Sequence, residues 1–379
     1  MGWPSAALGE VAEIERDSIA PESIRSGTRY VGLEHIASSG HLLFPPEVNA
    51  GELASSKFAF TREHLLYGKL RPYLSKIARP DFPGVCSTDI LPIRPGPSLD
   101  RNFLHHYLRL PNMVELANSR AAGANLPRLS PGVLASFAVP LPPLPEQRRI
   151  AEVLDRAETL RAQRRQALAQ LDALAEAIFL DMFGQFPPSQ SKPLAELCEL
   201  ITDGTHYTPT YAASGVTFLS ARNVTSGSIN WDDIKFIPQS LHIELHRRVA
   251  PQLGDLLLAK NGTTGVAAVV DRDLTFDIYV SLALLRPRSG VLSAYLHSAL
   301  NSDLCRRQFS AALKGIGVPN LHLKDIRTAR IPAPPTELQA KFVGRVDAIN
   351  ALKQSHRASL SHLNTLFTSL QHRAFRGEL

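Results

Sequence analysis

The chain has 379 residues, of which 44% are hydrophobic and 20% are charged, which is enough for two domains that each bury a core. Its 41 Lys and Arg residues exceed the 35 Asp and Glu residues by six, an excess too small to favour or exclude a nucleic-acid partner by itself. With three cysteines and no apolar run near the roughly 18 residues of a membrane span, the sequence excludes a disulfide scaffold and predicts a cytoplasmic protein without a membrane segment.

Short strand patterns rich in Val, Ile, Leu and Phe open the chain, and similar patterns return in its second half. The separation grows from 186 residues (positions 8 and 194) to 192 residues (positions 93 and 285). Small insertions explain this growth, because loops accept extra residues more readily than strands do. The matching segments are residues 8–11 and 194–197, 30–36 and 218–224, 65–69 and 256–260, and 93–95 and 285–287. The segments at 30–36 and 218–224 are predicted to be strands.

Each copy also contains a helical pattern near its end, at residues 105–110 and 294–300. Residues 261–265, with the sequence Asn-Gly-Thr-Thr-Gly, are typical of a tight hairpin or an exposed loop between the segments 256–260 and 266–270. Strands and helices within each copy therefore predict two α+β domains that form an internal repeat.

Each copy ends in two proline-containing segments followed by a glutamine. Proline is tolerated in the first turn of a helix and glutamate favours the positive end of its dipole, so the first long helix is predicted to start near Pro145 or Glu146. The predicted boundaries are a first domain at 1–144, a first helix at 145–183, a linker at 184–192, a second domain at 193–336, and a second helix with a tail at 337–379. The two sets of segments are Leu126-Pro127-Arg128-Leu129, Val139-Pro140-Leu141-Pro142-Pro143 and Gln147, and Val318-Pro319-Asn320-Leu321, Ile331-Pro332-Ala333-Pro334-Pro335 and Gln339.

Apolar residues recur at alternating spacings of three and four along both predicted helices, which is the pattern of a coiled-coil seam. One apolar stripe does not hold a helix in water, so we expect the two helices to pack as an antiparallel pair with pseudo-twofold symmetry. Arg164 and His356 occupy equivalent places in the two seams, and either form a polar layer near the crossing point or extend to solvent. The predicted seam consists of Ile150, Val153, Ala157, Leu160, Arg164, Leu171, Leu174 and Ile178, and of Phe342, Ile349, Leu352, His356, Leu363, Leu366 and Leu370.

Motifs for catalysis and cofactor binding are missing from the sequence. Residues 261–265 lack the spacing and the Lys-Ser/Thr ending of a phosphate-binding loop, and no Gly-x-Gly-x-x-Gly opens a helix after a strand. There is no His-Glu-x-x-His, and the adjacent His105 and His106 point to different sides of a helix. We therefore expect no catalytic residue, no metal site and no cofactor in this chain, and a role other than that of an enzyme.

One segment points to a known family. The stretch Asn125-Leu126-Pro127-Arg128-Leu129, leading to Val139-Pro140-Leu141-Pro142-Pro143-Leu144-Pro145-Glu146-Gln147-Arg148-Arg149-Ile150, resembles the specificity subunit of type I restriction-modification systems, as do the two domains that each precede a long helix. The second copy departs from this pattern at Thr336-Glu337-Leu338-Gln339, which predicts that a partner contact made by Glu146 is weaker or absent there.

The resemblance implies a noncatalytic subunit with two target-recognition domains, each reading one half of a split, asymmetric sequence in double-stranded DNA. The coiled coil would set the spacer between the half-sites. The implied partners are two methyltransferase (modification) subunits, which use S-adenosylmethionine to methylate adenines, and motor-endonuclease (restriction) subunits, which consume ATP with Mg. On this interpretation the protein acts in DNA modification and phage defence, and every cofactor belongs to its partners.

DNA recognition combines phosphate contacts with base contacts from loops, so the loops after residues 65–68 and 256–260 are the first candidates. The alternative is a noncatalytic coiled-coil scaffold whose end domains bind proteins and never touch DNA. Salt-sensitive, sequence-dependent binding to duplex DNA separates the two. The DNA-binding candidates are Lys57, Arg62, Lys69, Arg71, Tyr73 and Lys76 in the first copy, and His206, Arg222, Asn223, Lys260, Asn261, Thr263 and Thr264 in the second.

Overall fold

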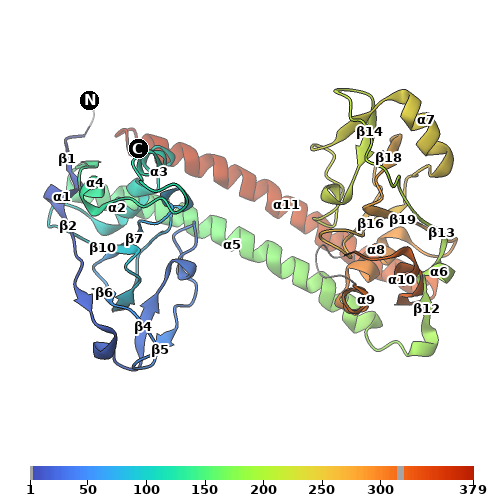
Figure 1. Cartoon of the computed structure of the whole chain (residues 1–379), viewed down its shortest axis with the longest axis horizontal. Coiled ribbons are helices and arrows are strands. Elements are labelled where there is room, and N and C mark those ends of the chain that lie inside the picture. The colour runs from blue at the N-terminus through green and yellow to red at the C-terminus, as the bar shows by residue number, and fades with distance from the viewer. Residues whose placement is uncertain (1–2, 314–319) are drawn as a thin grey trace. The chain divides into compact units, whose positions relative to one another are not determined.

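The computed structural model describes residues 3–313 and 320–379, which fall into two compact units (Figure 1). The first unit comprises the chain up to Arg165 together with Ala358–Leu379, and the second comprises Gln166–Arg357. Each unit contains one α+β domain and one end of each of two long helices, as predicted. Val318 and Pro319 of the second proline segment lie outside the described residues.

The main sheet has the same strand order in both units, and neighbouring strands are antiparallel. All residues of strands β7 and β16 are buried, because these short apolar runs lie inside the sheet. The order in the first unit is β2 (Ala12–Ile14), β10 (Ile90–Pro95), β7 (Leu65–Gly68) and β8 (Ile77–Ala78). In the second unit it is β13 (Cys198–Asp203), β19 (Leu282–Pro287), β16 (Leu256–Ala259) and β17 (Ala267–Val269).

A second sheet in each unit contains one parallel pair of strands, β4 with β9 and β14 with β18. The first unit has five strands in the order β3 (Ser18–Ile19), β6 (Lys57–Phe60), β9 (Gly84–Cys86), β4 (Thr28–Val31) and β5 (Glu47–Val48). The second unit has three, in the order β15 (Lys235–Ile237), β14 (Val216–Leu219) and β18 (Phe276–Ile278). The internal repeat therefore extends to the strand order of the main sheet and to the parallel pair of the second sheet.

A two-stranded sheet joins the start of each domain to the segment before its long helix. Strand β1 (Ser5–Ala7) pairs with β11 (Ala138–Pro140), and β12 (Ser191–Pro193) pairs with β20 (Arg330–Pro332). The short helices α1 (Leu8–Val11) and α6 (Leu194–Leu197) follow directly. Residues 184–192 are therefore not a plain linker, since they include the 3-10 turn η4 (Pro188–Gln190) and the start of β12.

Two of the remaining helices begin at a side-chain cap. Asp100 caps α2 by accepting hydrogen bonds from the backbone N–H groups of Asn102 and Phe103, and Ser130 caps α4 in the same way from Val133. The first unit contains α2 (Arg101–Leu108), α3 (Pro111–Ser119) and α4 (Pro131–Ala135). The second contains α7 (Gln239–Arg248), α8 (Ser293–Asn301), α9 (Asp303–Ala312) and α10 (Leu323–Thr328).

Residues 30–36 and 218–224 are strands only in their first part, contrary to the prediction. Strand β4 gives way to the 3-10 turn η2 (Leu33–His35), and β14 gives way to η5 (Ala221–Asn223). The reason is a side-chain cap at each turn: Nδ1 of His35 accepts from the N–H of Gly32 at 3.0 Å, and Oδ1 of Asn223 accepts from the N–H of Ser220 at 3.0 Å.

The two long helices are α5 (Leu144–Phe183) and α11 (Thr336–Ala374), and they run in opposite directions. In the first unit, Arg161 donates to Oδ1 of Asn364 at 2.7 Å and lies over the ring of Phe367. In the second unit, the ring of Phe342 packs edge-on against Phe179 and Phe183. The first half of each helix thus pairs with the second half of the other, which confirms the antiparallel arrangement.

The structure departs from the predicted seam at Leu160, Leu174, Leu352 and Leu366, which are about half exposed (48%, 47%, 54% and 50%). The best-buried positions are instead at the helix ends. Ile150 and Ala157 belong to the core of the first domain, and Phe342 belongs to that of the second. Burial is greater at the helix ends because each end packs on the α+β domain of its unit as well as on the other helix. The polar layer of Arg164 and His356 stays a prediction. No helix among the described residues is long and apolar enough to cross a membrane.

Candidate nucleic-acid interface

The loop between β7 and β8 has a strained backbone. Arg71 (φ 51°) and Ser75 (φ 50°) both adopt the left-handed conformation, which costs free energy for residues with a Cβ. They flank the 3-10 turn η3 (Pro72–Leu74), on which Tyr73 is 51% exposed. Such strain is concentrated at functional sites, so the loop remains a candidate for recognition.

The first proline segment holds this loop in place. The backbone N–H of Arg71 donates to the carbonyl of Pro127 at 2.8 Å, and the N–H of Leu129 donates to the carbonyl of Lys69 at 2.9 Å. In the second unit, the N–H of Leu321 donates to the carbonyl of Lys260 at 2.9 Å. Lys69 and Lys260 directly follow β7 and β16, so each proline segment fastens the base of the loop after the equivalent strand.

The matching loop of the second unit is a hairpin, one of the two forms predicted for residues 261–265. Residues 261–265 connect the antiparallel strands β16 and β17, and Gly262 and Gly265 supply the positive φ angles of the turn (73° and 83°). Thr263 is exposed, whereas Asn261 and Thr264 are half-buried. The two loops thus occupy the same place in the repeat but differ in composition and backbone conformation.

The other candidates divide by exposure. Arg62, Arg71, Tyr73, His206, Arg222 and Thr263 are exposed, and Lys69, Lys76, Asn261 and Thr264 are half-buried. Some of these side chains already have partners: the ammonium of Lys76 donates to the carbonyl of Leu33 at 2.6 Å, and Arg222 pairs with Asp233. Contact of any of these residues with DNA stays a prediction.

Lys57, Asn223 and Lys260 are buried (6%, 4% and 6% exposed), which contradicts their placement on a DNA-facing surface. Each has a role within the fold. Lys57 donates to the carbonyl and hydroxyl of Ser55, and the amide of Asn223 donates to the carbonyl of Asp233 at 2.8 Å. A buried amide or ammonium group needs such hydrogen-bond partners. The sequence does not reveal whether a polar residue near a loop is buried or exposed.

Lys260 instead belongs to a charge network around Asp203. Its ammonium lies 2.6 Å from Oδ2 of Asp203, while Arg248 and His206 lie 3.1 and 3.2 Å from Oδ1. Burial by itself would raise the pKa of Asp203, but the hydrogen bond and charge of Lys260, followed by those of His206, lower it. The carboxylate therefore remains ionised and fixes the end of β13 beside the end of β16.

Gln147 and Gln339 seat the two long helices in the same way. Both side chains are buried. Oε1 of Gln147 accepts from the N–H of Asp100 at 2.8 Å, and its Nε2 donates to the carbonyls of Ser98 and Pro142. Gln339 makes the equivalent three bonds with Leu292, Gly290 and Pro334. The amide therefore joins the first turn of each helix to the loop after β10 or β19.

Three exposed aromatic residues were not among the predicted DNA-binding residues. Phe44 is 97% exposed with φ 40°, and Tyr207 and Tyr211 are 49% and 40% exposed. Aromatic rings held in solvent are suited to stacking on nucleobases. Phe44 precedes Pro45 and Pro46, and this aromatic-proline run was the available signal.

The fold and the interface define a class of protein: a duplicated pair of α+β domains with divergent loops, joined through two antiparallel helices. Residues 2–171 match the family model of the type I restriction modification DNA specificity domain. The EcoDI specificity subunit of Escherichia coli is 32% identical over 186 residues, which are 48% of this chain and 41% of that subunit. The EcoKI specificity subunit of Escherichia coli strain K12 is 26% identical over 317 residues, 76% of this chain and 67% of that subunit.

Solved structures share the fold over nearly the whole chain. One solved structure comes from work on the structural basis of complex assembly and conformational transition of the type I restriction-modification system. It has a TM-score of 0.61 and 24% sequence identity, and the match covers 100% of this chain and 98% of that chain. The type I S subunit from M. genitalium has a TM-score of 0.60 and 13% identity, with 99% and 96% covered. Residues 2–171 thus match the DNA specificity domain, and the chain is similar in sequence to type I specificity subunits and in fold to their solved structures. Its match spans less than half the length of the EcoDI relative.

Proposed function

We propose that this chain is the DNA sequence-specificity subunit of a type I restriction-modification complex. Each α+β domain reads one half of a bipartite, asymmetric duplex target, and the antiparallel helices set the spacer. The observation that carries the proposal is the contrast between the two loops. Both follow the same place in the main sheet and are held by a hydrogen bond to a proline segment. Their residues differ: Arg71 and Tyr73 in one unit, and Asn261, Thr263 and Thr264 in the other.

The chemistry of the two loops suits different contacts with DNA. An exposed guanidinium such as that of Arg71 can bind the O6 and N7 atoms of guanine in the major groove. In the other loop, the hydroxyl of the exposed Thr263 can bond either kind of base edge. Arg62 and Lys69 supply charge for phosphate contacts. Two loops of this kind on one scaffold would read two unlike half-sites.

The same helices dock two methyltransferase subunits in this proposal. The half-exposed leucines support it, since Leu160 and Leu366 in the first unit and Leu174 and Leu352 in the second leave apolar surface on the helices. Motor-endonuclease subunits complete the complex. S-adenosylmethionine, ATP and Mg are assigned to the partner subunits, and this chain is assigned a noncatalytic role in the cytoplasm.

The test begins with the target sequence, which is obtained by mapping methylated adenines in the genome of the source organism. The chain is then purified with its methyltransferase partner, and binding to duplexes with and without the target is followed by fluorescence anisotropy over a range of salt concentrations. We expect binding that prefers the target by about 1,000-fold or more and weakens steeply with salt. Equal binding to all duplexes, or none, would contradict the proposal.

The substitution Arg71→Ala examines the loop directly. Loss of a bidentate base contact is expected to cost about 1–3 kcal/mol of binding free energy, and to relax the preference at one position of one half-site only. Arg376→Ala removes another exposed arginine, in the short tail after α11, and serves as the control. If both variants lose the same affinity for all duplexes, Arg71 contributes charge alone and reads no base.

A further inference from the structure

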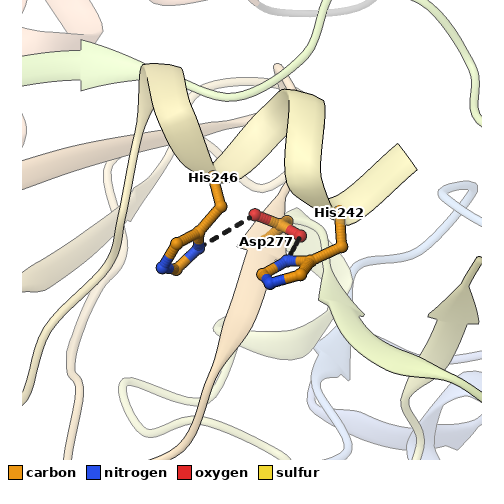
Figure 2. Close-up of side chains that lie close together, drawn as sticks. All are labelled: His242, His246 and Asp277. Atoms are coloured by element: carbon orange, nitrogen blue, oxygen red, sulfur yellow. Dashed lines mark hydrogen bonds and ion pairs between the residues drawn. The ribbon is translucent and has the colours of Figure 1, made fainter. Parts of the chain in front are cut away.

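Two histidines and an aspartate converge in the second unit at a place unrelated to the candidate DNA loops. His242 and His246 are four residues apart on α7, so they lie on one face of the helix, above Asp277 of β18 (Figure 2). Nδ1 of His242 lies 2.7 Å from Oδ2 of Asp277, and Nδ1 of His246 lies 3.4 Å from Oδ1. Asp277 is only 2% exposed, and the two imidazole centroids are 4.7 Å apart.

We propose that His242, His246 and Asp277 bind a divalent transition-metal ion of the Zn²⁺ type. Two imidazole nitrogens and one carboxylate oxygen are a donor set that such ions prefer, and three protein ligands leave a position for water. The three donor atoms lie within 4.8 Å of one another. Bonds of about 2.0–2.2 Å bring donors about 3.3 Å apart, so one ion fits after small side-chain rotations.

A second cluster of similar composition differs in that cationic side chains already pair with its carboxylates. His106, Asp155 and Glu158 also converge, in the first unit, but cations of the chain already occupy their oxygens. Arg79 binds Asp155 with both guanidinium nitrogens at 2.8 and 3.0 Å, and Arg109 binds Glu158 at 2.9 Å. Within the part of the chain that the structure describes, the ion-pair partners of Asp277 are His242 and His246 alone. The nearby Arg248 is bound to Asp203 and Gly204.

The internal repeat gives an independent argument. In the first unit Tyr30 of β4 is opposite Val85 of β9, and in the second Phe218 of β14 is opposite Asp277 of β18. Val85 and Asp277 therefore occupy equivalent places in the parallel pair. Val85 packs in an apolar cluster with Ile24 and Val48, so the fold does not require an acid here. Burial of a carboxylate costs free energy unless a cation or hydrogen bonds offset it, and a bound metal ion would supply that charge.

The surroundings favour a structural ion over a hydrolytic one. Glu244 is the carboxylate between the two histidines on α7, and its Oε1 accepts a hydrogen bond from the hydroxyl of Tyr207 at 3.0 Å instead of turning to the site. No general base thus stands beside the water position in the part of α7 between the ligands. The ion would link α7 to the β15-β14-β18 sheet. Its ligands on the two elements are 31 to 35 residues apart in the sequence.

The experiment uses the full chain after treatment with a chelator. Zn²⁺ or Co²⁺ alone is titrated, and stoichiometry, the visible Co²⁺ absorption and the midpoint of thermal unfolding are measured. We expect one ion per chain and a higher midpoint with metal, because a ligand that binds only the folded state stabilises it. His242→Ala and His246→Ala should each weaken binding by at least roughly tenfold. His362→Ala removes an exposed histidine of α11 and should bind as the unchanged protein does.

Two results would overturn the proposal: no saturable binding at about 100 µM Zn²⁺, or unchanged affinity in both histidine variants. X-ray absorption on the unchanged protein covers the case in which a variant fails to fold. The absorption spectrum is expected to show zinc bound by two imidazoles and by oxygen. Sulfur ligands, or fewer than two imidazoles, would show that the ion binds at another site. The proposal does not depend on DNA recognition, so either can fail without the other.

Discussion

At the scale of single residues, the buried glutamines determine how each long helix meets its domain. Gln147 and Gln339 are buried polar side chains, and each forms hydrogen bonds with three backbone groups. The same three bonds occur in both copies. This explains why the glutamine follows each proline segment at the same distance in the sequence.

Gln147→Ala should lower the free energy of unfolding by about 2–3 kcal/mol, because the N–H of Asp100 and the carbonyls of Ser98 and Pro142 lose their hydrogen bonds to a buried amide. Chemical denaturation followed by circular dichroism measures this. Gln163→Ala, at an exposed position of the same helix, should change stability by less than about 0.5 kcal/mol. Equal stability of the two variants would show that the amide network is not needed.

The buried His105 makes stability depend on pH. Burial, followed by the charges of Arg79 and Arg109, lowers its pKa well below 6.5. The folded state therefore binds its proton less readily than the unfolded state does, so the stability is fully present above about pH 6.5 and declines as the pH falls below it. The decline has a limit of about 1.4 kcal/mol per pH unit for one group.

Unfolding free energies at pH 7.5, 6.5 and 5.5 check this expectation. His105→Gln keeps a donor for the carbonyl of Ile77 but does not titrate in this range, so its stability should fall less steeply below pH 6.5 than that of the unchanged protein. The difference between the two proteins is the relevant quantity, because the half-buried His297 also has a lowered pKa and adds to both curves. Parallel curves would contradict the role given to His105.

At the scale of elements, the ends of the long helices are parts of the domain cores. Phe179 and Phe183 of α5 meet Tyr295 of α8 and Phe342 of α11 with ring centroids 5.1 to 6.2 Å apart. All four side chains are buried within the second unit. Edge-on aromatic contacts of this kind add to the free energy of apolar burial. The second domain and the helix ends therefore stabilise one another.

Phe183→Ala should destabilise the second unit by about 3–5 kcal/mol, since it leaves a cavity among the other three rings. Differential scanning calorimetry would show this as a lower midpoint for one transition. Leu180→Ala, on the same helix at a 40% exposed position, should cost less than about 1 kcal/mol. If both substitutions had the same small effect, the aromatic cluster would not anchor the helix.

At the scale of the whole molecule, the duplication predicts independent recognition. The two domains share the order of their main sheet strands, their proline-segment hydrogen bonds and their glutamine seats, but the loops after β7 and β16 differ. On the proposed function, exchanging residues 1–139 for those of another family member should change one half of the DNA target and leave the other half and the spacer intact. Adenine methylation patterns of cells with the exchanged chain measure this. A change in both halves would refute modular recognition.

Local patterns were sufficient for much of this fold. The repeat, the hairpin at 261–265, the strands β7 and β16 and the starts of the long helices follow from spacing, turn chemistry and helix signals within a few residues. These features were predicted because their causes lie close together in the chain. Even the seating glutamines were visible as repeated positions, although their partners were not.

Tertiary structure decided what depends on residues far apart in the sequence. Lys260 is buried because Asp203, 57 positions earlier, pairs with it, and the proposed metal ligands meet only because β18 places Asp277 under His242 and His246. The heptad pattern likewise could not show that helix ends would pack on domain cores and leave Leu160 and Leu352 half exposed. Burial is a property of the assembled neighbours, whereas sequence spacing describes one element at a time. Sequence alone therefore determined the duplicated scaffold, and the tertiary structure determined which polar residues on it are available to a ligand.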